Sequence, residues 1–153
     1  MNRETLKQYL ESTRVYDLHL YTPEMSKSAS NGWKLSIQGK SLDDSLFLWD
    51  RLHTMFEEMS IPYKMGTAKR LNLITNNDNR KREQGHKIMT IYIPNYLAKD
   101  EETVKVFAEL IYSKIRDYKG WYDIKLPTSY KHYAGGIFYR NDRNENGEYI
   151  SAN

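Results

Sequence analysis

Three cations stand inside apolar stretches of this sequence and could bind an anion together. Lys34 lies in the segment WKLSI, Lys64 lies in PYKM, and Arg140 ends GIFYR. Burying an unpaired charge is costly, so each cation alone is most simply interpreted as a residue on the solvent face of a strand. Three of them on separate predicted strands, with the basic loop Arg80-Lys81-Arg82, favour a convergent anion site instead. Arginine offers phosphate a planar fork of donors, and lysine offers a movable point charge.

The same residue types allow a proton transfer, whereas other chemistries find little support. A lysine removed from water can have its pKa lowered enough to act as a base. The sequence contains no phosphate-binding GxxxxGK[ST] loop, no GxGxxG and no GxSxG. It has no cysteine, and its four histidines, at positions 19, 53, 86 and 132, lack the spacing of metal ligands. We therefore expect neither a metal site nor a cofactor.

The length and composition suit a single domain over 1–153. A chain of 153 residues can bury a substantial core. The absence of cysteine suits a reducing cytoplasm, and neither a signal peptide nor a run of about 18 apolar residues is evident, so we expect a cytoplasmic protein without a membrane partner. The net charge of +3 is too mild to indicate a nucleic-acid partner, which we regard as unlikely.

The cations must be positioned by interspersed strands and helices. Apolar residues at helical spacing predict helices over 3–12, 42–59, 68–75 and 100–118, the second preceded by a capping box of Ser41 and Asp44. Extended segments are predicted over 15–21, 33–37, 61–65, 86–93 and 136–140. Residues 121–133 are expected to be irregular. The order lacks a regular βαβ cadence, so we predict an α+β domain: a mixed or largely antiparallel sheet with two main helices packed on it.

Four motifs, in this order, give the sequence a family resemblance. They are NGWKLSI, IPYKM, GHKIMTIYI and GIFYRNDR. Over about residues 31–148 the chain resembles the bacterial effector phosphothreonine lyases and the related lyase portion of class III and IV lanthionine synthetases. Each motif is weak alone, and their shared order carries the resemblance. These families cleave phosphothreonine or phosphoserine by β-elimination.

The resemblance implies a role for each matching residue. Lys64 falls on the base that takes the Cα proton. The positions that fall on phosphate-binding residues are Lys34, Arg140, a second arginine at Arg143, and one loop arginine, either Arg80 or Arg82.

One position departs from the family pattern. The histidine that protonates the leaving phosphate oxygen is replaced here by Ser36. A serine hydroxyl is a poor general acid near neutral pH, and loss of such an acid typically costs roughly 10²–10⁴-fold in rate. His86, beside the basic loop, is our first candidate for a replacement, with His19 and His132 as alternatives.

Three functions remain open at this point. The first is a phosphothreonine or phosphoserine lyase acting on a phosphorylated peptide or protein. The second is an inactive relative that binds a phosphorylated peptide or a phosphorylated small molecule, such as a nucleotide. The third is a nucleic-acid-binding module that uses the basic loop with exposed tyrosines for stacking.

Overall fold

The computed structural model describes residues 2–11, 19–21, 31–75, 87–121 and 129–150, and for 19–21 and 72–75 it describes the backbone alone. Within these residues six strands form one sheet in the order β1-β3-β4-β2-β6-β5, and every neighbouring pair is antiparallel. The strands are β1 (His19–Tyr21), β2 (Trp33–Gln38), β3 (Tyr63–Gly66), β4 (Lys87–Tyr92), β5 (Lys131–Ala134) and β6 (Ile137–Asn141).

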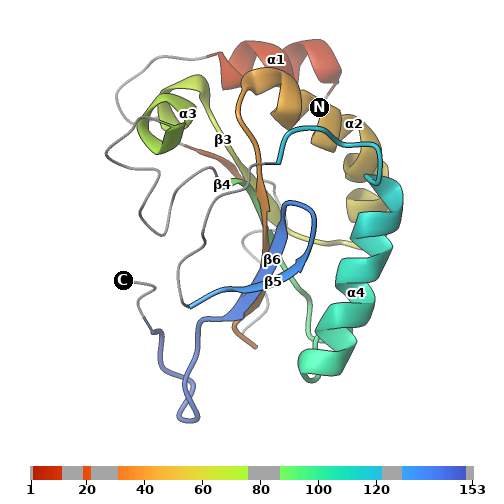
Figure 1. Cartoon of the computed structure of the whole chain (residues 1–153), viewed down its shortest axis with the longest axis vertical. Helices are drawn as coiled ribbons and strands as arrows, with labels where there is room; N and C mark the ends of the chain where they lie inside the picture. Colours follow the sequence, from red (N-terminus) through yellow and green to blue (C-terminus); the bar gives the residue numbers. More distant parts are fainter. Residues whose placement is uncertain (1, 12–18, 22–30, 76–86, 122–128, 151–153) are drawn as a thin grey trace.

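The helices cover the two faces of the sheet unequally. They are α1 (Arg3–Leu10), α2 (Leu42–Glu58), α3 (Ala68–Thr75) and α4 (Glu101–Lys114). Helices α1, α2 and α4 lie on one side of the sheet and α3 lies on the other, next to β3 (Figure 1). The α+β prediction is confirmed, and α2 and α4 are the two main helices packed on the sheet. None of the helices in the described residues is long and apolar enough to cross a membrane.

The core lies between the sheet and the layer of α1, α2 and α4. Alternate residues of the strands, such as Leu35 and Ile37 on β2, point into it, because successive side chains of a strand face opposite sides. Helix α2 contributes Leu52 and Phe56 from one stripe at helical spacing. The other face of the sheet is left for the residues between these, which include the three cations singled out above.

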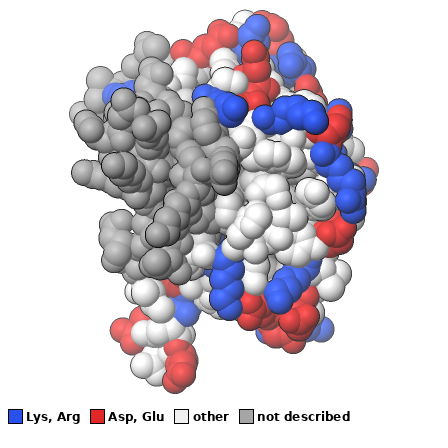
Figure 2. Space-filling model, in the orientation of Figure 1, with Lys and Arg blue, Asp and Glu red and all other residues white. Residues whose placement is uncertain are grey.

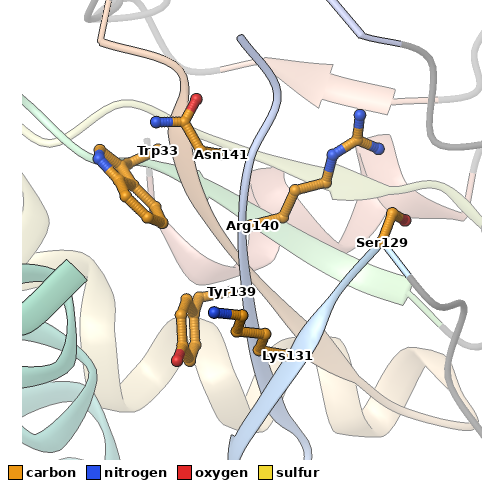
Figure 3. Close-up of a pocket in the computed structure, with 6 residues that line it drawn as sticks. All are labelled: Trp33, Ser129, Lys131, Tyr139, Arg140 and Asn141. Carbon is orange, nitrogen blue, oxygen red and sulfur yellow. The ribbon is translucent and has the colours of Figure 1, made fainter. Parts of the chain in front are cut away.

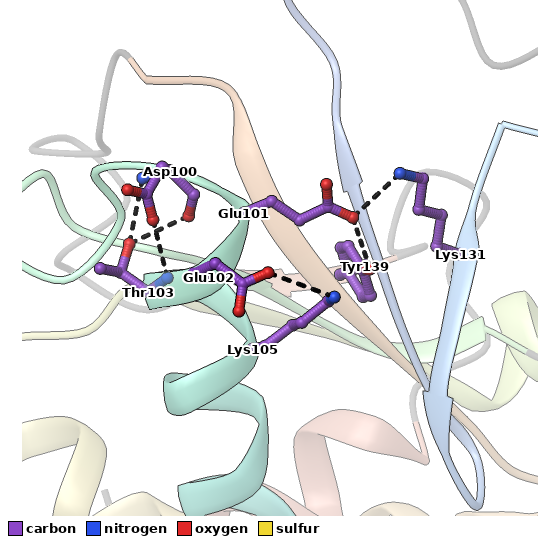
Figure 4. Close-up of polar contacts among 7 residues, drawn as sticks. All are labelled: Asp100, Glu101, Glu102, Thr103, Lys105, Lys131 and Tyr139. Atoms are coloured by element: carbon purple, nitrogen blue, oxygen red, sulfur yellow. Dashed lines mark hydrogen bonds and ion pairs between the residues drawn. The ribbon is translucent and has the colours of Figure 1, made fainter.

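Both long helices begin at capping boxes. The predicted box of Ser41 and Asp44 starts α2. At the start of α4, Asp100 accepts a hydrogen bond from the backbone N–H of Thr103 (2.9 Å), and the Thr103 hydroxyl accepts one from the N–H of Asp100 (3.0 Å) (Figure 4). Each box satisfies two backbone donors that the helix leaves unpaired.

The next residue, Glu101, ties α4 to the sheet. Its carboxylate accepts hydrogen bonds from Lys131 on β5 (2.9 Å) and from the Tyr139 hydroxyl on β6 (2.7 Å) (Figure 4). These two donors hold the pKa of Glu101 below its ordinary value. The contacts fix the N-terminus of α4 beside β5 and beside β6, the strand that carries Arg140.

The cap can be tested directly. We expect Asp100→Ala to lower the free energy of unfolding by about 0.5–2 kcal/mol, because it removes the acceptor for the N–H of Thr103. Urea unfolding followed by circular dichroism measures the change. The control is Glu57→Ala on the exposed side of α2, which should stay within about 0.5 kcal/mol of the wild type. Equal stability of the two variants would contradict the capping role.

The structure corrects two boundaries. Residues 131–134 form β5, although the whole of 121–133 was expected to be irregular. This short edge strand forms by pairing with β6 across a turn at Gly135, whose φ of 53° lies in the left-handed region. Helix α4 ends at Lys114 rather than near 118, yet Tyr118 remains in the core and its hydroxyl donates to the carbonyl of Gln38 (2.6 Å).

Candidate functional site

Strand register brings the three cations onto one face of the sheet. Lys34 on β2 lies opposite Arg140 on β6, and Ser36 lies two residues further along β2. Lys64 on β3 lies opposite Thr90 on β4, which in turn lies opposite Ser36. Side chains at directly opposed positions of an antiparallel sheet share a face. We call this side, which lies away from the core, the cation face.

Two further cations that sequence reasoning missed belong to this face. Lys87 starts β4. Arg70 lies on α3 and packs closely over Gly66: a Cβ added to this glycine would lie 3.0 Å from Cγ of Arg70. Both lie close enough to Lys64 to act on its charge. Burial, followed by repulsion from Lys87, Lys34 and Arg70, lowers the pKa of Lys64 to about 8. A substantial fraction of this amine is therefore neutral near physiological pH and can accept a proton.

Arg140 is a buried cation, and the described residues do not use all of its hydrogen-bond donors. Its side chain is only 4% exposed. One terminal nitrogen, Nη2, donates to the backbone carbonyl of Ile150. The other, Nη1, is buried and has no hydrogen-bond partner among the described residues. An unmet buried donor costs free energy, so an anion placed against Nη1 would be favoured.

Lys34, which lies opposite Arg140, has a carboxylate beside its positive charge. Its Nζ lies 3.6 Å from a carboxylate oxygen of Asp142. The other oxygen of the same carboxylate lies 3.7 Å from Nε of Arg143. Arg143 is thus connected to Lys34 only through Asp142, and its guanidinium also donates to the carbonyl of Gly147 in the turn that follows β6 (3.5 Å).

The position expected to hold an acid has no proton-donating partner. Ser36 is 1% exposed, and its Oγ finds no hydrogen-bond partner in the described part of the chain. His132 lies on β5 opposite Phe138, which separates it from Ser36 by one strand. The His132 Nε2 donates to the carbonyl of Gly135 (2.7 Å), so this donor is already used within the turn.

Some predicted site residues fall outside the described part. Arg80, Arg82 and His86 lie among the residues that the structure does not describe. His19 opens β1 opposite Gly66, and only its backbone is described. Their proposed roles stay predictions. Among the described residues no group of three or more acidic or histidine side chains is placed to hold a metal ion.

A separate pocket lies beside the start of β5. It has a volume of about 240 Å³ and is lined by Trp33, Ser129, Lys131, Tyr139, Arg140 and Asn141. In Figure 3 the guanidinium of Arg140 points toward Ser129 and away from the Trp33 and Tyr139 rings. Tyr139 and Lys131 belong to the side that contacts α4. The pocket therefore shares only Arg140 with the cation face and is not the place where the three cations meet.

On the face seen in Figure 2 the described surface is mixed in charge. Figure 2 shows basic and acidic residues alternating around an uncharged area in the view of Figure 1. No continuous basic surface is seen among the described residues in that view. The feature that distinguishes this molecule is the set of cations on one face of the sheet.

The fold defines an α+β protein with a six-stranded antiparallel sheet in its described part, three helices on one face, and a cation face on the other. It is similar to a solved structure, that of the type III effector/phosphothreonine lyase OspF from Shigella flexneri, with a TM-score of 0.57 and 14% sequence identity over 93% of this chain and 76% of that chain. No family model matches the sequence, and the comparison with curated proteins found no match. At this identity the likeness shows a distant structural relationship, a shared fold.

Proposed function

We propose that the cation face is the active site of a lyase that removes phosphate from phosphothreonine or phosphoserine in a peptide or protein by β-elimination. The observation that carries the proposal is the register that places Lys34, Lys64 and Arg140 on one face of the sheet. The unpaired, buried Nη1 of Arg140 supports a phosphate contact there. The likeness in fold to a phosphothreonine lyase is consistent with it.

In the proposed site, two residues bind the phosphate and a third takes the proton. Arg140 and Lys34 hold the phosphate oxygens, and their charges stabilise the negative charge that grows as the phosphate leaves. The neutral amine of Lys64 takes the proton from Cα. The electrons of that C–H bond form the Cα=Cβ double bond, and the Cβ–O bond breaks with its electrons on the phosphate oxygen. The products are a dehydro residue and inorganic phosphate.

The lowered pKa of Lys64 supports the choice of base. A base must be unprotonated to act, and an ordinary lysine is almost fully protonated at neutral pH. With a pKa of about 8, Lys64 supplies a usable fraction of neutral amine. Lys34 pairs instead with Asp142 at 3.6 Å, and its proposed part is to bind the phosphate.

The second candidate is a protein that binds the same phosphate group without eliminating it. The observation that favours it is Ser36, which stands where the resemblance implies a proton-donating histidine. In that case the ligand is a phosphorylated peptide or a phosphorylated small molecule, and the cation face acts as a clamp alone.

Mass spectrometry separates the two functions. We expect incubation with a phosphothreonine peptide to yield dehydrobutyrine, the product of elimination, rather than threonine, the product of hydrolysis. The control is the same peptide without protein under the same conditions. An unchanged peptide that nevertheless binds in calorimetry would support the clamp, and recovery of threonine would indicate a phosphatase instead.

A further inference from the structure

The phenol of Tyr130 contacts a lysine from a distant strand of the cation face. Tyr130 immediately precedes β5, at the outer side of β6, whereas Lys87 starts β4. Strand β2 lies between β4 and β6. Strand β6 lies between β2 and β5. Even so, Nζ of Lys87 lies 3.0 Å from the hydroxyl of Tyr130, so the two side chains meet across the strands that separate them. Neighbouring strands lie about 4.8 Å apart, so β4 and β5 are separated by about 14 Å, which two long side chains that point toward each other can span.

The surroundings of this phenol are cationic and nearly dry. Tyr130 is 6% exposed. Its ring centroid lies 5.0 Å from Nζ of Lys87 and 5.8 Å from the guanidinium carbon of Arg140. Tyr130 therefore stands between a lysine that acts on Lys64 and the arginine proposed to hold phosphate.

The direction of the hydrogen bond leaves the phenol proton available. A lysine ammonium can only donate, so the oxygen of Tyr130 accepts from Lys87. The hydroxyl hydrogen must then point to a different acceptor. Within the described residues the bond from Lys87 is the one hydrogen bond of the Tyr130 hydroxyl. Nη1 of Arg140 has no partner among them. The guanidinium carbon of Arg140 lies 5.8 Å from the Tyr130 ring centroid, and an anion with several oxygens could accept from both groups.

We propose that Tyr130 donates the proton to the departing phosphate oxygen, the role that the family resemblance gives to a histidine at the position of Ser36. This inference rests on the proposed function. It places the acid just before β5, whereas the resemblance indicates a residue on β2. Ser36, which β6 separates from His132, is then left with no part in the proton transfer.

The step balances without a further reactant. Lys64 gains the Cα proton and becomes an ammonium, while the Cβ–O bond breaks and the phosphate oxygen receives the proton of Tyr130. The resulting phenolate is stabilised by the ammonium of Lys87, which already donates to it. After the products leave, water carries the proton from Lys64 back to Tyr130, and both groups regain their starting forms.

The test uses Tyr130→Phe and two peptides that differ in the leaving atom. One contains phosphoserine, which loses an oxygen leaving group, and the other contains S-phosphocysteine, which loses a sulfur leaving group that needs far less protonation. We expect Tyr130→Phe to slow elimination from phosphoserine by roughly 10²–10⁴-fold. We expect a much smaller loss on S-phosphocysteine and binding of both peptides within a fewfold of the wild type. The matched control is Tyr133→Phe, whose hydroxyl donates to Glu109 on α4, on the other face.

Three other results would contradict the role of Tyr130 as the acid. An equal loss on both peptides, or a loss of binding, would show that Tyr130 holds the phosphate or the fold, and would overturn its role as acid. Full activity of Tyr130→Phe on phosphoserine would overturn this inference while leaving the proposed function intact. A wild-type protein that eliminates neither peptide would overturn the proposed function itself, and this inference with it.

Discussion

Replacing Lys64 with methionine is expected to abolish elimination while leaving phosphate binding largely intact. Methionine keeps the length of the side chain and removes the amine that takes the Cα proton. Loss of a general base typically costs roughly 10²–10⁴-fold in rate. The phosphate contacts of Arg140 and Lys34 remain, so the affinity for a phosphothreonine peptide should fall far less than the rate. Product formation by mass spectrometry and affinity by calorimetry measure the two effects separately.

The control for Lys64→Met has the same change of charge on the opposite side of the molecule. Lys105 lies on α4, where it pairs with Glu102 at 3.5 Å and is 43% exposed. Lys105→Met should therefore eliminate phosphate at the wild-type rate. If Lys64→Met were as active as this control, Lys64 would not be the base, and Lys34 or Lys87 would have to be tested in its place.

The pH dependence of the wild-type rate follows from the same residue. Burial and the neighbouring cations lower the pKa of Lys64 to about 8, and the base acts only when it is deprotonated. We expect kcat/KM, which reports groups of the free enzyme, to rise with pH until it levels off above about 8. A profile that levels off near pH 10, as for an ordinary lysine, would show that the amine is not the desolvated group described above.

The elements of the fold were largely predictable because their signals are local. The capping box of Ser41 and Asp44 marked the start of α2, and the run after His86 marked β4. Strand β5 was missed because it is four residues long and depends on pairing with β6 rather than on its own composition. Helix α4 was predicted to run too far because Tyr118 is a core residue outside the helix, and an apolar pattern cannot distinguish the two cases.

The site was predictable only in part. The cations at Lys34, Lys64 and Arg140 stood out because each interrupts an apolar strand sequence, and the register indeed places them on one face. Lys87 escaped notice because regular alternation from Thr90 would put it among the core residues. A register shift between Ile37 and Gln38 places Lys87 opposite Gln38 instead.

Tyr130 was beyond the reach of sequence reasoning for a different reason. It lies at the end of a segment without periodicity, and its contact with Lys87 spans 43 residues of sequence. Only the strand order β4-β2-β6-β5 brings the two onto one face of the same sheet. A tyrosine-rich sequence offers 13 such rings and no local signal that selects this one.

Replacing Arg140 with glutamine is expected to weaken binding of a phosphothreonine peptide by roughly 30-fold to more than 1,000-fold, from the 2–5 kcal/mol that loss of one partner of a buried, hydrogen-bonded charge pair typically costs. The reason is the buried Nη1, which has no other partner in the described residues and would lose its phosphate contact. Arg140→Lys should restore part of the affinity, because it keeps the charge but not the fork of donors. Calorimetry at fixed ionic strength measures all three proteins.

A general effect of net charge must be separated from the loss of this contact. Arg51 on α2 provides the comparison, since its guanidinium pairs with Asp117 at 2.7 Å and is 41% exposed. Arg51→Gln changes the net charge by the same amount as Arg140→Gln but should leave peptide affinity unchanged. Equal weakening by both variants would mean that the peptide is held by the overall charge of the molecule. Loss of affinity at Arg140 alone would place the phosphate on the cation face, whether or not elimination follows.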